Sequence, residues 1–429
     1  MYKKQNQVYA SLFTMLLSPV FTLYAALRNG NRSYVRWVIF IFTIFYASTW
    51  DIEGIGDGSR HWQNVYDYYV GLNFGQFVAD IGDILLFKNN PNINEDLYIH
   101  VISYLVGGIL SLPGLFFIVV AMVYGYFFAG SMVKTFEIFP TYRRSILFLG
   151  IAIVFIMQLN IQSMNTVRTW TGFWILYYAC ISYYQSGRRK YIWLMFVPPF
   201  VHIGYFIMAI PAWIVVFARN RKLLYSILFF ISFTTTIINP GQTINTLNEL
   251  EVGKEKVHGY YQEEQTTVDQ TLEYYEQSRW YVQYQKIGVL GWSIAVMAGL
   301  FIVSGRYFRD MNYLEASMFS VGIVTKVLSN STWFLYAVAN RSNAIAISFI
   351  LAAILLYWQR KYVNEGGIRF SRLEKVVMYT TGITFLPYYV YLLSNTIEYL
   401  SALMFAFPFL AWISEDLKIT VRELIGYFL

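Results

Sequence analysis

The chain has 429 residues, of which 57% are hydrophobic and 13% are charged, and its formal net charge is +7 at pH 7. Soluble proteins carry about 25% charged residues, so this composition excludes an ordinary soluble enzyme and indicates a helical membrane protein. The positive charge does not indicate a nucleic-acid partner, because the lysines and arginines are spread over many short loops instead of lying on one face.

Apolar segments recur along the whole chain at membrane-spanning length. A spanning helix needs about 20 mostly apolar residues. The sequence therefore predicts an all-α, polytopic membrane protein with about thirteen transmembrane helices, in one transmembrane domain over residues 1–429. The predicted helices lie near residues 8–27, 37–50, 112–133, 145–163, 169–186, 191–204, 205–218, 223–240, 287–304, 313–336, 343–358, 374–394 and 398–413.

Two long polar segments, 51–111 and 241–286, interrupt this pattern. The first contains IGDGSRHWQNVYDYY and continues through an amphipathic stretch that we expect to lie on the membrane surface. The second is acidic and polar, which favours helical pieces over the outer face. Loops this long between packed helices are usually functional, so the sequence places any chemistry on the side where both segments lie.

The distribution of charges predicts which side that is. The loops at 28–36, 134–144, 187–190, 219–222, 304–312 and 359–375, with the C-terminal tail, hold 21 of the 32 lysines and arginines. The segments 51–111 and 241–286, with Glu398, hold 17 of the 25 acidic residues. Basic loops stay in the cytoplasm, so both long segments are predicted to be extracytoplasmic.

Two arginines lie on the side where the charge distribution disfavours them. Arg168, in SMNTVRTWTGFW, has no carboxylate within thirty residues, and Arg341 lies in ANRSNAIAISF. Such a cation either faces water or binds an anion from outside the protein. A guanidinium grips phosphate through paired hydrogen bonds, and a helix N-terminus adds attraction for the same anion. The sequence therefore predicts that both arginines bind a lipid phosphate or diphosphate.

Other polar residues on the predicted outer side are further candidates. His202 and Asp57 could act as a base, although His202 could equally be structural. Lys326 lies within a predicted span, where an ionisable group is a functional candidate by default, but it could also pair with carbonyl groups. The candidate substrate-binding residues are Arg60, His61, Tyr66, Tyr69 and Lys326. No carboxylate or histidine spacing indicates a metal site, and no cofactor is predicted.

The run NTVRTWTGFWILYYACISYYQSGRRKYIWLMFVPPFVHIGYFIMAIP resembles the central pattern of the EpsG-like, Wzy-type bacterial polysaccharide polymerases. In that pattern an arginine opens a helix, a basic turn follows, and the next helix ends with a histidine. These positions match Arg168 and His202. The stretch IGDGSRHWQNVYDYY is similar to the family's upstream outer motif, and Arg341 matches its late arginine.

The resemblance implies a GT-C-like membrane glycosyltransferase in the bacterial cytoplasmic membrane, with its active site facing outward. Such an enzyme joins oligosaccharide repeat units carried on undecaprenyl diphosphate into a capsule, O-antigen or exopolysaccharide. Its partners would be the lipid-linked donor and acceptor, membrane lipids and a chain-length regulator. In these roles Arg168 and Arg341 would bind the diphosphate, and His202 would serve as the base or as a donor to the diphosphate.

Three alternatives stay open at the level of sequence. An O-antigen ligase or another lipid-phosphate-sugar glycosyltransferase shares the leaving group but uses a different acceptor. A flippase or other transporter of lipid-linked saccharides would show inverted repeats and charges along a central path. A structural scaffold would leave the two outer arginines unexplained.

Overall fold

The computed structural model describes residues 12–29, 31–50, 56–86, 88, 96–136, 146–235, 280, 289–333, 335–365, 368, 370–414 and 417–427. In this part of the chain the secondary structure is helical, apart from one isolated bridge between Ser401 and Thr420. The predicted outer segment 241–286 lies outside the described residues, except for Trp280. The all-α prediction is confirmed.

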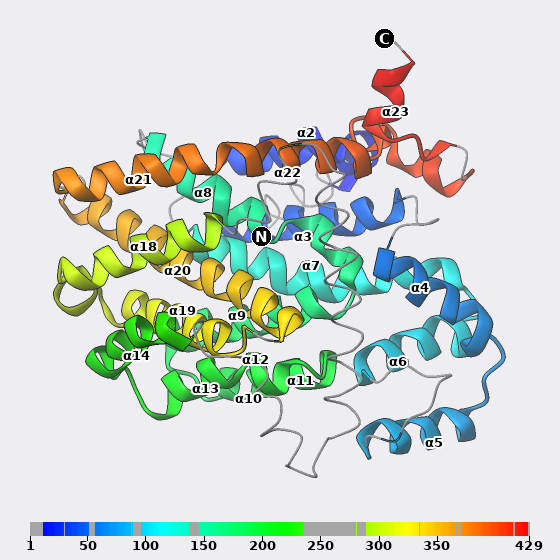
Figure 1. Cartoon of the computed structure of the whole chain (residues 1–429). Coiled ribbons are helices and arrows are strands. Elements are labelled where there is room, and N and C mark those ends of the chain that lie inside the picture. The colour runs from blue at the N-terminus through cyan, green and yellow to red at the C-terminus, as the bar shows by residue number, and fades with distance from the viewer. Residues whose placement is uncertain are drawn as a thin grey trace. The chain divides into compact units, whose positions relative to one another are not determined.

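The chain divides into two compact units. Figure 1 labels the helices of both units. Unit 1 consists of Met1–Arg143, Leu159–Ala209 and Leu393–Leu429, and unit 2 consists of Arg144–Gln158 and Ile210–Leu392. No linker composition marks these boundaries, and for this reason the sequence predicts one continuous domain.

Unit 1 contains short helices in its first half and longer ones around its centre. Its α-helices are α2 (Pro19–Asn29), α3 (Arg32–Ser48), α4 (Gly56–Asn64), α5 (Phe74–Leu85), α6 (Leu97–Ser103), α7 (Phe116–Thr135), α9 (Thr169–Ser186), α10 (Lys190–Leu194), α11 (Pro198–Val201), α12 (Tyr205–Met208) and α23 (Val421–Gly426). Short π- and 3₁₀-helices are η1 (Val65–Tyr69), η2 (Tyr104–Ile109), η3 (Pro113–Leu115), η4 (Ile161–Thr166), η6 (Ala402–Met404) and η7 (Pro408–Trp412). α7 packs between α3 and α9 and forms the centre of the unit.

Unit 2 is organised around a long helix that packs along its neighbour. Its elements are α8 (Ile146–Gln158), α13 (Ile210–Phe217), α14 (Lys222–Thr235), α18 (Val289–Val303), η5 (Arg306–Asp310), α19 (Tyr313–Ser331), α20 (Tyr336–Glu365) and α21 (Arg372–Thr384), followed by α22 (Leu386–Tyr399), which continues into unit 1. α20 packs mainly against α19, and it also contacts α8 and α18.

In the part of the chain that the structure describes, four helical stretches are long and apolar enough to cross a membrane: Pro113–Thr135, Ile146–Thr166, Ala337–Glu365 and Arg372–Tyr399. Five shorter apolar helices, of 10–17 residues, accompany them. The stretch Ala337–Glu365 is 89% buried over its most apolar window, whereas Arg372–Tyr399 is 22% buried. A helix that is apolar all round and buried belongs to a core, and an apolar helix with exposed sides suits lipid.

The structure differs from the predicted spans where proline or turn geometry intervenes. Residues 191–204 contain the short helices α10 and α11 in place of one long helix. Pro198 and Pro199 have no backbone N–H, so they cannot donate the hydrogen bonds that would continue the preceding helix. After α22 ends at Tyr399, the remainder of the predicted span 398–413 forms only η6 and η7, so these residues do not make a spanning helix. There Phe407 has φ +57°, and the backbone N–H of Ala402 donates to Ile419 O, which ties this segment to the C-terminal tail.

In unit 1, basic residues lie at the C-terminal end of α9. Lys134 Nζ donates to Gln185 Oε1 at 2.8 Å, and Arg188, Arg189 and Lys190 follow the C-cap residue Gly187 directly. Arg168 lies at the opposite end of this helix, whose 18 residues span about 27 Å. That length approaches the hydrocarbon thickness of a bilayer, about 30 Å, so Arg168 and the basic loops are separated by a membrane-sized distance.

In unit 2, three basic residues are each bound by another element of the same unit. Lys222 Nζ donates to Tyr307 O at 2.8 Å, Arg306 forms a two-pronged ion pair with Glu374, and Arg360 does the same with Glu315. Both glutamates also cap the helices that they begin, through capping boxes with Ser371 and Asn312. Each carboxylate therefore fixes a helix start and an arginine from another element at once.

We expect Glu374→Gln to destabilise the protein by about 2–3 kcal/mol, because Arg306 loses the charge of a buried partner. The midpoint of thermal unfolding of the purified protein in detergent measures this loss. Glu423→Gln is the matched control, since Glu423 holds the same capping-box position in α23 but is exposed and pairs with no arginine in the ion pairs that the described residues form. Equal shifts in the two variants would contradict a stabilising ion pair.

Candidate functional site

The candidate site lies in unit 1, at the N-terminal end of helix α9. Arg168 occupies the N-cap position, and Val167 before it is buried and has φ +51°, a backbone conformation that β-branched residues rarely adopt. Such strain costs about 1–3 kcal/mol and often marks a functional site. Thr171 donates to Val167 O at 2.5 Å and holds this turn against the first turn of α9.

Asp96 is the central carboxylate of this site. It lies at the N-cap position of α6 but makes no capping hydrogen bond, and its side chain is fully buried. Its Oδ2 accepts from Arg168 Nη1 at 2.5 Å and lies 3.1 Å from His202 Nδ1, while its Oδ1 accepts from Ile203 N at 2.7 Å. The expectation that Arg168 has no carboxylate partner in the protein is therefore wrong.

His202 reaches Asp96 because helix α11 ends at this residue. His202 is the C-cap of α11, with extended backbone angles, and it is buried. The next helix is tied to the start of α9, since Tyr205 Oη donates to Thr169 O at 2.7 Å. Gly172 permits this approach, because a Cβ there would lie 2.6 Å from the ring of Tyr205. His202 therefore caps the four-residue helix α11, whereas the sequence predicted it near the end of one continuous helix over 191–204.

Helix α4 carries a second acidic group to the same region. Asp57 forms an ion pair with Arg60, and its Oδ2 lies 3.6 Å from Nε2 of His61. That nitrogen is buried and makes no hydrogen bond among the described residues. Gly58 lets α4 pack closely on η4, since a Cβ there would lie 2.3 Å from Asn165 Oδ1. Residues that the sequence separates by a hundred positions thus lie on adjoining elements.

The electrostatics connect the two acidic groups. Burial alone raises the pKa of Asp96, but the neighbouring imidazole of His202, the charge of Arg168 and the N–H of Ile203 together hold this pKa below its ordinary value. Burial likewise opposes ionisation of Asp57, whereas His61, Arg60 and the charge of Arg168 lower its pKa well below the usual range. Both carboxylates are therefore ionised at neutral pH, and Arg168 is close enough to stabilise each of them.

The two predicted tyrosines lie in different surroundings. Tyr66 is 43% exposed and packs edge-on against Trp62. Tyr69 is fully buried, and its hydroxyl is hydrogen-bonded with His100 Nδ1 at 2.8 Å. Tyr66 can therefore meet a ligand from solvent without rearrangement, whereas a ligand contact of Tyr69 would require this buried hydrogen bond to open. Sugar binding by either residue stays a prediction.

Arg341 and Lys326 both lie in unit 2. Arg341 does not precede a helix as predicted, because α20 begins at Tyr336 and places Arg341 in its second turn. The polar run around it is helical because it packs on α19, with Ser329 Oγ donating to Ala339 O at 2.8 Å. Lys326 Nζ donates to Asn343 Oδ1 at 2.7 Å.

The sequence does not single out Asp96 as a site residue, although this aspartate lies in the predicted outer segment 51–111. A signal was present, because Asp96, Arg168 and His202 all fall on the predicted outer side, where a buried cation needs a counter-charge. Sequence distance concealed the pairing, since 72 residues separate Asp96 from Arg168 and 106 separate it from His202.

This arrangement can orient a histidine and present a guanidinium beside it. A carboxylate only accepts hydrogen bonds, so the bond to Asp96 places the proton of a neutral His202 on Nδ1 and the basic lone pair on Nε2. Among the described residues, no three His, Cys, Asp or Glu side chains lie close enough to hold a metal ion. No protein-family model, curated protein or solved structure matches this chain.

Proposed function

We propose that the protein is a membrane glycosyltransferase that joins lipid-diphosphate-linked oligosaccharide units into a polysaccharide at the outer face of the bacterial cytoplasmic membrane. The carrying observation is the buried cluster of Asp96, Arg168 and His202, which lies at the end of α9 opposite the basic loops. The four long apolar helices supply the membrane-embedded scaffold that such a reaction needs.

In this proposal His202 is the base and Asp96 is its positioning residue. Nε2 of His202 takes the proton from an acceptor sugar hydroxyl, and the hydroxyl oxygen forms a bond to the anomeric carbon of the donor. The bond between that carbon and the lipid diphosphate breaks, and the diphosphate leaves with the electron pair. A base placed in this way contributes about 10²–10⁴-fold in rate.

Arg168 meets the negative charge that develops on the leaving diphosphate. A guanidinium carries five N–H donors in a planar fork, so one nitrogen can pair with Asp96 while the group faces a second anion. Asp57, Arg60 and His61 lie beside this position and would contact the sugars. Preorganised charge of this kind is usually the largest single contribution to catalysis.

The direct test is reconstitution of the purified protein with lipid-diphosphate-linked repeat units. We expect a ladder of products that lengthens by one repeat unit per step, resolved by gel electrophoresis after release of the saccharide. Transfer of a single unit without a ladder would indicate a sibling transferase with another acceptor. Vectorial movement of the lipid-linked unit across the vesicle without any new glycosidic bond would contradict the enzyme proposal.

We expect His202→Gln to lower kcat by about 10²–10⁴-fold with little change in KM, because glutamine retains a hydrogen-bonding group but cannot accept a proton at neutral pH. Initial rates of ladder formation measure both constants. His100→Gln is the control, since His100 is also buried in unit 1 but bonds to Tyr69 and lies outside the Asp96 cluster. A raised KM with unchanged kcat in His202→Gln would assign His202 to binding.

A further inference from the structure

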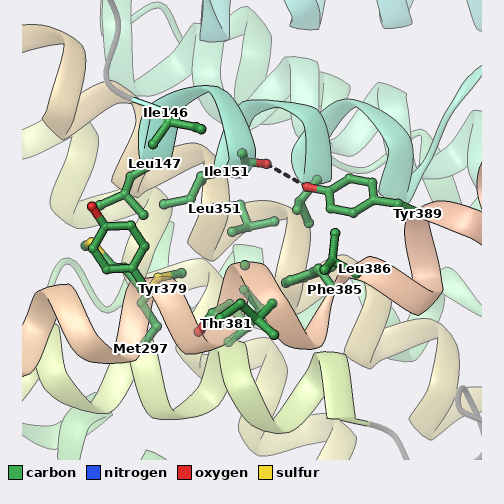
Figure 2. A pocket seen from close by; sticks show the side chains of 16 residues that line it. Ile146, Leu147, Ile151, Met297, Leu351, Tyr379, Thr381, Phe385, Leu386 and Tyr389 are labelled. Carbon is green, nitrogen blue, oxygen red and sulfur yellow. Dashed lines mark hydrogen bonds between the residues drawn. The ribbon is translucent and has the colours of Figure 1, made fainter.

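Unit 2 contains an apolar cavity of about 310 Å³ between α8, α18, α20, α21 and α22 (Figure 2). Its lining consists of aliphatic and aromatic side chains, two methionines, two glycines and Thr381, and none of these residues is charged. The Tyr389 hydroxyl donates a hydrogen bond to Gly150 O at 3.0 Å, so this hydroxyl already has a partner (Figure 2). The cavity therefore offers almost no hydrogen-bonding group to an occupant.

Such a space suits hydrocarbon better than water. An apolar cavity of about 150 Å³ stays dry and binds a benzene-sized molecule, and this one is about twice as large. An empty space of this size also forfeits the dispersion contacts of its lining. Ile146, Ile383 and Leu386 line the cavity and are 77%, 65% and 57% exposed, so the space opens to the outside of the helices.

On α20 and on the stretch Arg372–Tyr399 the cavity lies near the middle, whereas on α8 its lining begins at the first residue, Ile146. Leu351 is close to the centre of α20, which runs from Tyr336 to Glu365, and Phe385 is close to the centre of the stretch Arg372–Tyr399. α8 and the α21–α22 stretch are the least buried of the four candidate spans, at 33% and 22%. These two stretches therefore present the most exposed apolar surface of the four, which suits the hydrocarbon interior of a bilayer.

A cation lies on α19, the neighbour of α20: Lys326 reaches Asn343 of α20, although neither residue is among those that line the cavity. The described residues give Lys326 a single partner, the neutral amide of Asn343, and no carboxylate. Asn343 lies against the first turn of α18, since a Cβ at Gly291 would be 2.8 Å from its Nδ2. Ile294 of the cavity lining is one helical turn further along α18. Leu351 is eight residues, about 12 Å, beyond Asn343 on α20.

We propose that unit 2 binds a lipid-linked substrate of the polymerase, with the polyprenyl chain in this cavity and the phosphate group toward Lys326 and Asn343. The assignment to a polyprenyl carrier rests on the proposed function, because polymerisation consumes two lipid-linked substrates at once. One cation and a space for part of one chain fit a single-chain phosphate lipid. A diacyl phospholipid could place only one of its two chains in a space of this size.

The test uses the full-length protein in nanodiscs and a polyprenyl phosphate that carries a photoreactive diazirine in its chain. We expect the label on peptides from residues 146–154 and 378–389, and we expect unlabelled polyprenyl phosphate, but not a diacyl phospholipid, to compete. Competition by the phospholipid alone, or label spread evenly over lipid-facing helices, would overturn the proposal. The probe carries no saccharide, so its labelling does not depend on polymerisation.

Two glycines of the lining provide variants that fill the cavity. A Cβ added at Gly150 or Gly382 meets no atom within 4 Å, so Gly150→Leu and Gly382→Leu should fold and lose the label. Gly82→Leu is the matched control, because Gly82 is also helical and open but lies in α5 of unit 1. Lys326→Met should weaken probe binding about tenfold, the contribution of one charge-assisted hydrogen bond.

The failure of this proposal and the failure of the proposed function give different results. Specific labelling without ladder formation would retain the lipid site and reject the polymerase. Ladder formation with an unchanged KM in Gly150→Leu and Gly382→Leu would retain the polymerase and reject the cavity as its lipid site. Should either leucine variant be unstable, mapping of the labelled peptides in the wild-type protein decides the question alone.

Discussion

Arg168→Lys is expected to lose polymerisation by about 10²–10³-fold although the charge is kept. An ammonium is a compact point charge, and it cannot hold Asp96 through one nitrogen while a planar fork faces the diphosphate. Arg168→Ala should lose at least as much, because it also removes the partner of the fully buried Asp96. The measurement is the initial rate of ladder formation, normalised to correctly folded protein.

Arg422→Lys provides the control for the Arg168 variants. Arg422 is 62% exposed in its ion pair with Glu398, and exposed pairs contribute about 0–1 kcal/mol, so this variant should retain wild-type rates. Wild-type rates in Arg168→Lys would show that charge alone suffices. Wild-type chain lengths in Arg168→Ala would remove Arg168 from the mechanism.

Asp96→Asn is expected to lower kcat by about 10²–10⁴-fold and the free energy of unfolding by about 2–4 kcal/mol. The rate falls because an amide can donate to Nδ1 of His202, which moves the imidazole proton to Nε2 and removes the basic lone pair. The stability falls because Arg168 and Ile203 N lose a charged acceptor in a buried position. Ladder kinetics and thermal unfolding measure the two effects separately.

The stability effect of Asp96→Asn should also depend on pH in a defined direction. The folded pKa of Asp96 lies below its ordinary value of 3.8, so its ionised form stabilises the fold above that value. This contribution is lost as the pH falls through the folded pKa. The difference in unfolding midpoint between wild type and Asp96→Asn should therefore shrink as the pH falls below about 4.

Asp83→Asn is the matched control for Asp96→Asn. Asp83 also carries an ion pair in unit 1, but its partner Lys88 is 61% exposed, so we expect a change of less than about 1 kcal/mol and normal ladder kinetics. A stability loss in Asp96→Asn without a rate loss would make Asp96 purely structural. A rate loss that Asp83→Asn shares would point to a general effect on unit 1.

The sequence by itself determined the class of the protein and the ends of its best-defined helix. Composition and apolar run length indicate a helical membrane protein, and the predicted helix 169–186 coincides with α9. These features are local, because hydrophobic length and helix-ending residues act within one segment. The prediction that Arg168 begins a helix is correct for the same reason.

Tertiary structure alone decided which charges meet. Asp96 joins Arg168 and His202 across 72 and 106 residues, and no periodicity in the sequence encodes a contact between segments so far apart. The broken helices at 191–218 and the turns at 398–413 arise from proline and from packing, which hydropathy does not detect. The cavity of unit 2 likewise exists only because five helices leave space together. A contact between distant segments depends on their joint packing, whereas a single helix depends mainly on its own residues.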